Sequence, residues 1–503
     1  MPANSQQISA RMQRMAEDYF GTLSYAEIIL VRKAVTPDEA VCGPSPDPND
    51  SSNNPDLALN WGDNREVRAE VIRWLCIDRE AKILVDPLGI QLMGARITGG
   101  LDLRYAVVPF PIRLTRCRLT QRVRIQMLHI PALILIGTRT VSITADSSNI
   151  THSVFFDKGC RADGEVSFVG AHIGGNLVFN ESSFFNKGGD AISLGSIDVG
   201  GSIFLRFPFR AEGGVSLIGA RVGSDVDCSG GRFLSPGKLA LLLHRAAVRG
   251  AINLGASGRD KFRADGIVDL RNCIANILTD EGGGWPDRKH LQLNGFAYQS
   301  ILPADARSRL LWLDLDDSGS AQPYRQLAKV LENSGDSKGA QLVLVEMEAR
   351  LAKASDSVPV WLLKSFIAYG YKPQRAMWGL LVMSGLGWLL YWRSHRMGYM
   401  VPSEKDALEN NGSTKTLAPY YPRFNALICS VENTFPLVKL FQADKWQPDP
   451  ERAPPSTGSW LSRFLHWTRK PPFMRVFIWV QILLGWLLAT LFVAGISGII
   501  RHG

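Results

Sequence analysis

The residues of this chain that could do acid–base chemistry are separate carboxylates and single histidines within a stretch of short apolar runs. Enzymes that act on polysaccharides gather such groups along one face of a β-helix, but sequence spacing does not show which of these residues meet. The histidines also lack a nucleophile at a motif spacing such as GxSxG. Solvation of turns and faces is therefore our preferred interpretation. These residues are Asp198, Asp225, Asp227, Asp269, His129, His152, His172 and His244.

Glycine pairs and cysteines could indicate a nucleotide, a metal or disulfides. The pairs are at 99–100, 174–175, 200–201 and 230–231, and none opens an amphipathic helix after a strand or precedes a Walker lysine. We interpret them as coil corners. No CxxC pair or His/Cys cluster with zinc spacing occurs, so we predict no cofactor, no metal and no disulfide framework. The single cysteines are expected as small core residues: Cys42, Cys76, Cys117, Cys160, Cys228, Cys273 and Cys429.

A short apolar helix predicted at 422–435 could line a pore. Leu427, Ile428 and Val431 have helical spacing, and Pro436 ends the segment, which is too short to span a bilayer. It could be a re-entrant pore helix or an interfacial helix that lies flat, and the second is the commoner outcome. The candidate pore-lining or re-entrant residues are Ser430, Glu432 and Asn433.

Two apolar runs flank this segment, at about 376–392 and 476–500, and both reach transmembrane length. Arginines bracket them, and tryptophans lie where interfacial belts would form. We predict a two-span membrane domain over 373–503, with loop 393–475 between the spans. The first residues lack the apolar run of a signal peptide, so the preceding domain should face the cytoplasm. Basic residues before the second span conflict with the positive-inside rule, so the side of the loop stays open.

The region 89–300 is a repeat. Its phrases Arg161-Ala-Asp-Gly, Arg210-Ala-Glu-Gly and Arg263-Ala-Asp-Gly recur at offsets of 49 and 53 residues, with alternating aliphatic residues between them. Alternation points one side chain in two toward a core. A period near 50 is long for a single coil, so each repeat should hold two or more. The fold class is mainly β: a right-handed β-helix (solenoid), with a β-sandwich or barrel as the alternative.

Helical segments flank the repeat. Residues 1–88 predict a helical N-terminal cap, with a capping box at Ser24–Glu27 and an amphipathic helix at Asn64–Leu75. Residues 301–372 predict a helical hairpin adaptor, formed by Tyr324–Asn333 and Ser337–Ala352. A DNA-binding helix-turn-helix is disfavoured because the second helix carries glutamates where phosphates would be met.

The charge balance indicates a membrane surface. Lys and Arg number 56 against 47 Asp and Glu, a net charge of +9, and basic residues crowd beside the apolar runs. An anionic bilayer is therefore a better partner than nucleic acid.

The sequence resembles a bacterial family of membrane-associated, pentapeptide-repeat-like β-helix proteins. The resemblance is carried by 61–75, by Gly89-Ile-Gln-Leu-Met-Gly-Ala-Arg-Ile-Thr-Gly-Gly-Leu-Asp-Leu, by the arginine phrases, and by 322–331 and 369–373. It covers nearly the whole chain and implies residence in the bacterial inner membrane. Some members are labelled membrane-associated oxidoreductases, although no motif here supports a cofactor.

We therefore expect a membrane-anchored β-helix scaffold or recognition protein without a catalytic site. A protein partner would bind the β-helix face, and a homo-oligomer is an open alternative. The second hypothesis is a membrane channel or membrane-disrupting effector controlled by the β-helix. The third is the oxidoreductase that the family labels suggest.

Overall fold

The computed structural model describes residues 3–282, 284–287, 289–316, 318–352, 374–404, 407–411, 414–435, 437–449 and 471–497. The chain divides into two compact units, Met1–Val343 and Leu344–Gly503. Each unit is described by itself.

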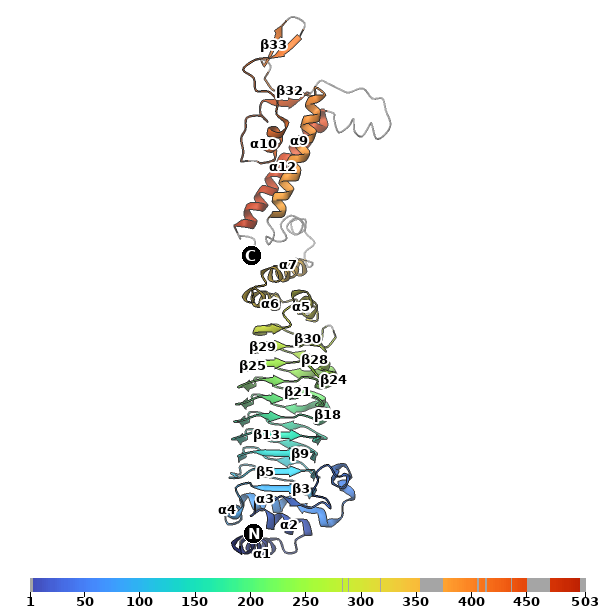
Figure 1. The fold of residues 1–503 in the computed structure, drawn as a ribbon, viewed down its shortest axis with the longest axis vertical. Coiled ribbons are helices and arrows are strands. Elements are labelled where there is room, and N and C mark those ends of the chain that lie inside the picture. Colours follow the sequence, from blue (N-terminus) through green and yellow to red (C-terminus); the bar gives the residue numbers. More distant parts are fainter. Residues whose placement is uncertain are drawn as a thin grey trace. The chain divides into compact units, whose positions relative to one another are not determined.

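The first unit is a β-solenoid of about nine turns, with strands stacked one above the next (Figure 1). Each complete early coil contributes four short strands, and each strand pairs in parallel with its equivalents in adjacent coils. The first ladder is β1 (Ala40–Val41), β3 (Ile90–Met93), β5 (Ile112–Thr115), β9 (Leu133–Ile136), β13 (Val154–Asp157), β17 (Leu177–Val178), β20 (Ile203–Phe204) and β23 (Val226–Asp227). The second is β2 (Glu66–Arg68), β4 (Arg96–Thr98), β6 (Arg118–Leu119), β10 (Arg139–Thr140), β14 (Arg161–Ala162), β18 (Ser183–Ser193), β21 (Arg210–Ser216), β24 (Arg232–Leu242) and β28 (Arg263–Asp269).

The other two ladders merge with these in the later coils. The third is β7 (Val123–Arg124), β11 (Ile143–Thr144) and β15 (Val166–Ser167), continued by the second halves of β18 to β28 and by β30 (Leu291–Gln292). The fourth is β8 (His129–Ile130), β12 (Asn149–Ile150), β16 (His172–Ile173), β19 (Asp198–Val199) and β22 (Arg221–Val222). The last strands, β25 (Ala247–Asn253), β29 (Ile274–Thr279) and β31 (Ala297–Leu302), continue both the fourth ladder and the first. A small antiparallel pair, β26 (Ala256–Ser257) and β27 (Asp260–Lys261), projects between two coils.

The coil length explains the sequence repeat. Along the first ladder, paired residues of successive coils from β3 to β31 lie 21 to 26 positions apart. Arg161 pairs with Ser183, which in turn pairs with Arg210, so the 49-residue repeat contains two coils. The prediction of two or more coils per repeat is confirmed.

A repeat of two coils has a reason in the core. The residue that follows Arg161, Ser183 or Arg210 is buried, and along the second ladder the side chain at this position alternates between small and large. A small side chain in one coil leaves room for an aromatic ring in the next, which fills the core at native density. The ring centroids of Phe184 and Phe209 are 5.9 Å apart, and those of Phe209 and Phe233 are 5.3 Å apart. The alternating residues are Ala162, Phe184, Ala211, Phe233 and Ala264.

The glycine pairs lie between consecutive strands of a coil, as predicted for corners. At 174–175 and 200–201 the requirement is close stacking, whereas Gly99 and Gly230 adopt a positive φ. A Cβ on Gly174 would lie 2.2 Å from the Thr151 carbonyl oxygen, and one on Gly200 would lie 2.3 Å from that of Gly174. Another corner also needs the left-handed conformation, and there Ser147, Ser196, Gly170 and Gly219 all adopt a positive φ.

The N-terminal segment contains α1 (Ala3–Phe20), α2 (Tyr25–Lys33), α3 (Ala69–Ile77), α4 (Ala81–Leu84) and the 3-10 helices η1 (Ser51–Asn53), η2 (Pro55–Asn60) and η3 (Asp63–Arg65). The capping box of Ser24 and Glu27 is confirmed. The predicted helix at Asn64–Leu75 is wrong in its first part, because Glu66–Arg68 forms β2 and pairs with β4. Pairing with the next coil satisfies these backbone groups, and the helix begins only at Ala69.

Helices also follow the last coil: α5 (Ala306–Leu313), α6 (Gln322–Asn333) and α7 (Ser337–Ala352). The predicted pair of helices at 324–333 and 337–352 is confirmed. The side chains of Gln322 and Gln326 donate to the carbonyl oxygens of Phe296 and Tyr298, at 3.1 and 2.6 Å. These bonds satisfy the edge of the last coil, which would otherwise offer free pairing groups. The rest of the predicted adaptor, 353–372, lies outside the described residues.

After the end of α7, the second unit contains three helices, α9 (Gln374–Arg396), α10 (Ala426–Thr434) and α12 (Pro471–Ile496), within the part of the chain that the structure describes. Strands β32 (Met400–Pro402) and β35 (Trp446–Pro448) pair in antiparallel fashion, and β33 (Leu408–Asn411) and β34 (Thr414–Leu417) form a hairpin. Helix α10 lies beside both α9 and α12, and α9 packs on α12 (Figure 1).

The membrane prediction needs a correction. Two spans were expected, but in the described ranges one helix, Phe473–Ile496, is long and apolar enough to cross a membrane. The run 376–392 is helical within α9, but its Ser, Gly, Trp and Tyr residues lower its hydropathy. The end of the second predicted span, 498–500, lies outside the described residues.

Candidate functional site

Helix α10 is held against α9 and α12 by close contacts at two glycines. A Cβ on Gly387 of α9 would lie 2.2 Å from the Ser430 hydroxyl, and one on Gly485 of α12 would lie 2.2 Å from the Thr434 carbonyl oxygen. Small residues let helix backbones approach one another in this way. The Asn425 side chain caps α10 by accepting hydrogen bonds from the amides of Leu427 and Ile428.

A buried glutamine joins the three helices. Gln481 of α12 has no exposed surface, and its Oε1 accepts a hydrogen bond of 2.6 Å from the Tyr391 hydroxyl of α9. Its Nε2 donates to the hydroxyl of Thr434 at 2.8 Å and to the hydroxyl of Ser430 at 3.1 Å. The Ser430 hydroxyl donates in turn to the carbonyl oxygen of Ser384 at 2.7 Å. We call Ser384, Tyr391, Ser430, Thr434 and Gln481 the polar cluster.

The structure separates the three candidate pore-lining residues. Ser430 is fully buried within the polar cluster, and the Asn433 amide lies 3.3 Å from the Tyr391 hydroxyl at its edge. Glu432 faces the loop after α10, where its carboxylate accepts hydrogen bonds from the amides of Phe441, Gln442 and Ala443 at 3.1, 2.8 and 2.8 Å. Pore lining by these residues stays a prediction.

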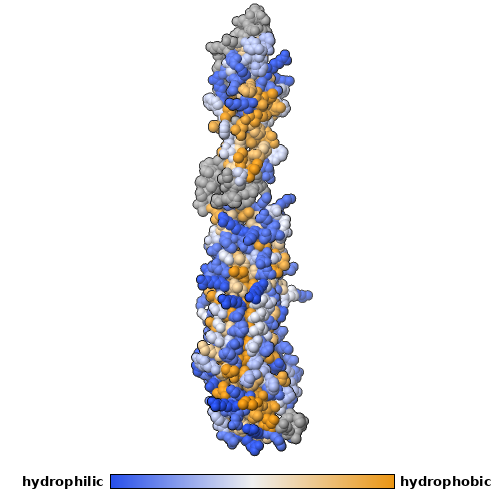
Figure 2. All heavy atoms as spheres, turned by 90° about the vertical axis from the view of Figure 1, so that its left-hand side faces the viewer, coloured by the Kyte–Doolittle hydropathy of each residue, from blue (hydrophilic) through white to orange (hydrophobic). Residues whose placement is uncertain are grey.

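The outer surface of the same helices is apolar. In Figure 2, hydrophobic residues gather on the part of the chain that carries α9 and α12. Only 17% of the most apolar window of α12 is buried. The core helix of a soluble protein would bury most of such a window. Large exposed side chains on the two helices are Trp378, Leu381, Val382, Leu386, Trp388, Leu389, Trp392, Val476, Trp479, Val480, Leu483, Trp486, Val493 and Ile496.

The solenoid carries a different feature, a column of arginines at the first position of the second ladder. Successive coils of a parallel sheet are about 4.8 Å apart, so residues paired in register stand directly above one another. Ser183 interrupts the column once. We call it the arginine ladder; its members are Arg96, Arg118, Arg139, Arg161, Arg210, Arg232 and Arg263.

The first three arginines, the proximal ladder, are covered by the chain's own residues 49–66. Arg139 makes a two-point contact with Asp56, at 2.6 and 2.7 Å. Arg96 contacts Glu66 at 2.7 Å and Asp63 at 3.3 Å. The hydrogen bond from Arg139 lowers the pKa of Asp56, and the charges of neighbouring ladder arginines act in the same direction.

The remaining arginines, Arg161, Arg210, Arg232 and Arg263, form the distal ladder, and the first three of them have nearby carboxylates from the solenoid. Arg161 pairs with Asp163 at 2.7 Å, Arg210 with Glu212 at 2.6 Å, and Arg232 with Asp260 at 3.3 Å. Sequence reasoning noted the recurring arginine phrases but missed this ladder. Once the coil length is known, the signal is visible, because the arginines recur at nearly every coil.

Among the acid–base candidates, which all lie in the described residues, one pair is within hydrogen-bond distance. The His172 Nδ1 atom lies 3.0 Å from the Asp198 carboxylate on adjacent coils of the fourth ladder. Both side chains are more than half exposed, as expected of a surface contact. Asp227 lies on the first ladder, and Asp269 lies on the third, where it pairs with Arg271.

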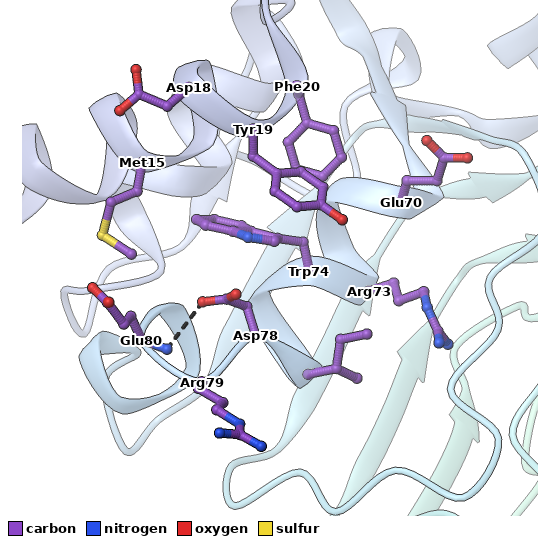
Figure 3. Close-up of a pocket in the computed structure, with 11 residues that line it drawn as sticks. Met15, Asp18, Tyr19, Phe20, Glu70, Arg73, Trp74, Asp78, Arg79 and Glu80 are labelled. Atoms are coloured by element: carbon purple, nitrogen blue, oxygen red, sulfur yellow. Dashed lines mark hydrogen bonds between the residues drawn. The ribbon is translucent and has the colours of Figure 1, made fainter.

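An open groove of about 1060 Å³ lies in the N-terminal segment, and sequence reasoning missed it. Figure 3 shows Tyr19 and Phe20 of α1 packed with Trp74 of α3, and carboxylates around them. One of these carboxylates has a structural use, since Asp78 accepts hydrogen bonds from the amides of Glu80 and Ala81 at the start of α4.

The cysteines are core residues, as predicted, because all seven are buried. Burial raises the pKa of the Cys117 and Cys160 thiols to about 12, which keeps them protonated and unreactive at neutral pH. Within the described ranges, no three His, Cys, Asp or Glu side chains form a group that could hold a metal ion.

Fold and surface together define the class: a β-solenoid protein with a C-terminal helical unit whose outer surface is apolar. No family model, curated protein or solved structure matches the chain.

Proposed function

We propose that the chain is a membrane-anchored scaffold, in which the C-terminal helices lie in a lipid bilayer and the solenoid binds a protein partner. The observation that carries the anchor is the exposed apolar surface of α12, of which only 17% is buried over its most apolar window. Contiguous apolar surface of this kind favours a lipid environment. The 24 residues of Phe473–Ile496 are sufficient for the hydrocarbon core.

We further propose that α9 crosses the bilayer beside α12, which gives two spans. Its exposed Trp378, Leu386 and Trp392 support this, as does its packing on α12. Helix α10 then re-enters between the two spans, and the polar cluster is the means by which it is held at that depth. Hydrogen bonds within the cluster satisfy groups that would be costly to expose to lipid.

The solenoid supports the scaffold assignment by presenting charged side chains at regular intervals. We propose that its coils are right-handed, the usual sense for parallel connections. The unpaired thiols of its buried cysteines fit a reducing compartment, so we propose that it faces the cytoplasm from the bacterial inner membrane.

Vesicle flotation tests the anchor. Full-length protein reconstituted in phosphatidylcholine–phosphatidylglycerol vesicles should float with the lipid and resist extraction by alkaline carbonate. The double variant Leu483→Arg/Trp486→Arg charges the exposed surface of α12 and should shift the protein to the soluble fraction. Val107→Arg/Ile274→Arg is the matched control, since it charges two exposed apolar residues of the solenoid. Wild-type protein that stays soluble beside intact vesicles would contradict the anchor.

The second candidate function is a pore. It is favoured by the contacts of α10 with the middle of α9 and α12, through Ser384, Gly387, Gln481 and Gly485. A pore predicts conductance in planar bilayers that Asn433→Ala or Glu432→Ala alters. Bilayers that stay sealed at high protein density would remove this candidate and leave the anchor intact.

A further inference from the structure

The distal ladder is a docking surface: we propose that Arg161, Arg210, Arg232 and Arg263 bind an extended acidic segment of a partner polypeptide. The proposal rests on the scaffold function and specifies the class of partner. The four arginines stand on one column of the second ladder, over four coil steps.

The proximal part of the same column is already covered by polypeptide. Residues 49–66 approach it with carboxylates and with backbone oxygens. Arg96 donates to the carbonyl oxygen of Trp61 at 2.8 Å, and Arg118 donates to that of Pro55 at 3.4 Å. Together with the contact between Asp56 and Arg139, these bonds show which chemistry the column accepts: an acidic chain with accessible carbonyl oxygens. The distal ladder continues that interface beyond the end of the covering segment.

The distal arginines are more exposed than the proximal ones. The side chains of Arg161, Arg210 and Arg232 are 41, 43 and 47% exposed, against 14% for Arg96 and 20% for Arg139. A guanidinium has five N–H donors. The side chain of Arg161 makes one hydrogen bond, to Asp163, and that of Arg232 makes one, to Asp260. Donors therefore remain for a ligand.

The local carboxylates do not close the site. The carboxylates of Asp163 and Asp260 are 48 and 35% exposed, and pairs of this kind contribute little to stability, so a ligand that reorients them loses little. Glu212 is less exposed, at 15%. The carboxylate of Glu212 is also shared by Arg210 and by Lys187, whose side chain is 83% exposed. The Arg161 guanidinium lies over the Phe185 ring at 4.4 Å, which holds it in place for a ligand.

The dimensions fit a short extended segment. Four coil steps of about 4.8 Å give a column of about 19 Å, which an extended chain spans with about six residues. Acidic residues at every second position of such a segment would face the column.

The experiment uses the full chain in detergent micelles and a fluorescent twelve-residue peptide of alternating aspartate and serine, read by anisotropy at low salt. The control peptide has asparagine in place of aspartate. We compare the wild type with Arg161→Gln/Arg210→Gln/Arg232→Gln. The matched control is Arg124→Gln/Arg221→Gln/Arg249→Gln, which removes the same charge from exposed arginines outside the ladder. Circular dichroism verifies that both variants are folded.

The ladder variant should bind the aspartate peptide about tenfold more weakly, and the control variant should bind within about twofold of the wild type. Equal weakening in both variants would overturn the proposal, since net charge would then explain binding. Tighter wild-type binding to a single-stranded oligonucleotide than to the peptide would also overturn it. Vesicle flotation of the ladder variant should be unchanged, so failure of this docking surface and failure of the membrane anchor give different results.

Discussion

The solenoid and the C-terminal helices place polar and apolar groups in opposite ways. In the solenoid, phenylalanines, alanines and aliphatic residues fill the interior, and the arginine ladder faces outward. In the C-terminal unit, Gln481, Ser430 and Thr434 are inside, and tryptophans and leucines face outward. The two arrangements suit different solvents, because exposed charge favours water and exposed apolar surface favours lipid.

The two units also obtain close packing by different means. The solenoid alternates large and small side chains between coils, so its density depends on volume. The C-terminal helices instead bring backbones together at Gly387 and Gly485, and hydrogen bonds fix their register. A cavity should therefore harm the first unit most, and an added side chain should harm the second.

The largest expected effect is a cavity in the solenoid. Phe233→Ala should lower the free energy of unfolding by about 3–5 kcal/mol, because the ring is fully buried between coils. Urea unfolding followed by β-sheet circular dichroism measures it. Phe185→Ala, at a half-buried ring two coils away, is the control and should cost far less. Equal losses in the two variants would mean that the alternating column does not set the packing.

The matching test of the second unit adds volume. Gly387→Val should destabilise the contact of α9 with α10 by about 2–3 kcal/mol, since even a Cβ would lie 2.5 Å from the Gln481 amide. Gly385→Val is the matched control on the same helix, because no atom lies within 4 Å of a Cβ built there. In limited proteolysis in bicelles, the chain that follows α10 should be cleaved faster in the Gly387 variant than in the wild type. Equal cutting of both variants would contradict the close-contact role of Gly387.

The next largest effect is expected in acid, at the buried carboxylate of Glu27 in the first unit. Burial would raise the pKa of Glu27, but hydrogen bonds from Arg68 and from the Ser24 amide outweigh it, and the pKa lies below the usual 4.5. The stability that this carboxylate supplies is therefore present above pH 4.5 and is lost as pH falls through its lowered pKa. Glu27→Gln should cost about 1.5 kcal/mol at neutral pH and little in acid. Urea midpoints against pH measure this, with the exposed Glu17→Gln as control.

The smallest expected effect is at the polar cluster. Gln481→Leu should cost about 1 kcal/mol in lipid, since hydrogen bonds between helices in membranes are individually weak. Thermal unfolding in nanodiscs, together with Tyr391→Phe in a double-mutant cycle, isolates the bond between the two side chains. The exposed Gln447→Leu is the control. A stabilised Gln481→Leu variant would show that the cluster does not hold α10.

Local patterns predicted much of the fold. The capping box at Ser24 and the helices at 324–333 and 337–352 depend on neighbours in sequence, and the structure has them. Glu66–Arg68 was predicted as helix because its strand partner, Arg96–Thr98, is distant in sequence. The arginine ladder was missed for the same reason, since register between coils is a long-range property. Ser430 and Asn433 were named as polar residues of one helix, but their partners Ser384, Tyr391 and Gln481 could be assigned only after three separate segments were brought together.

The alternation of Ala162, Phe184, Ala211, Phe233 and Ala264 restricts how this solenoid could change its length. Insertion or loss of a single coil would set two rings, or two alanines, against each other and leave the core crowded or hollow. A change of two coils keeps the order of sizes. The unit by which such a chain can be lengthened or shortened, in nature or by design, is therefore a segment of about fifty residues that begins at an arginine of the ladder.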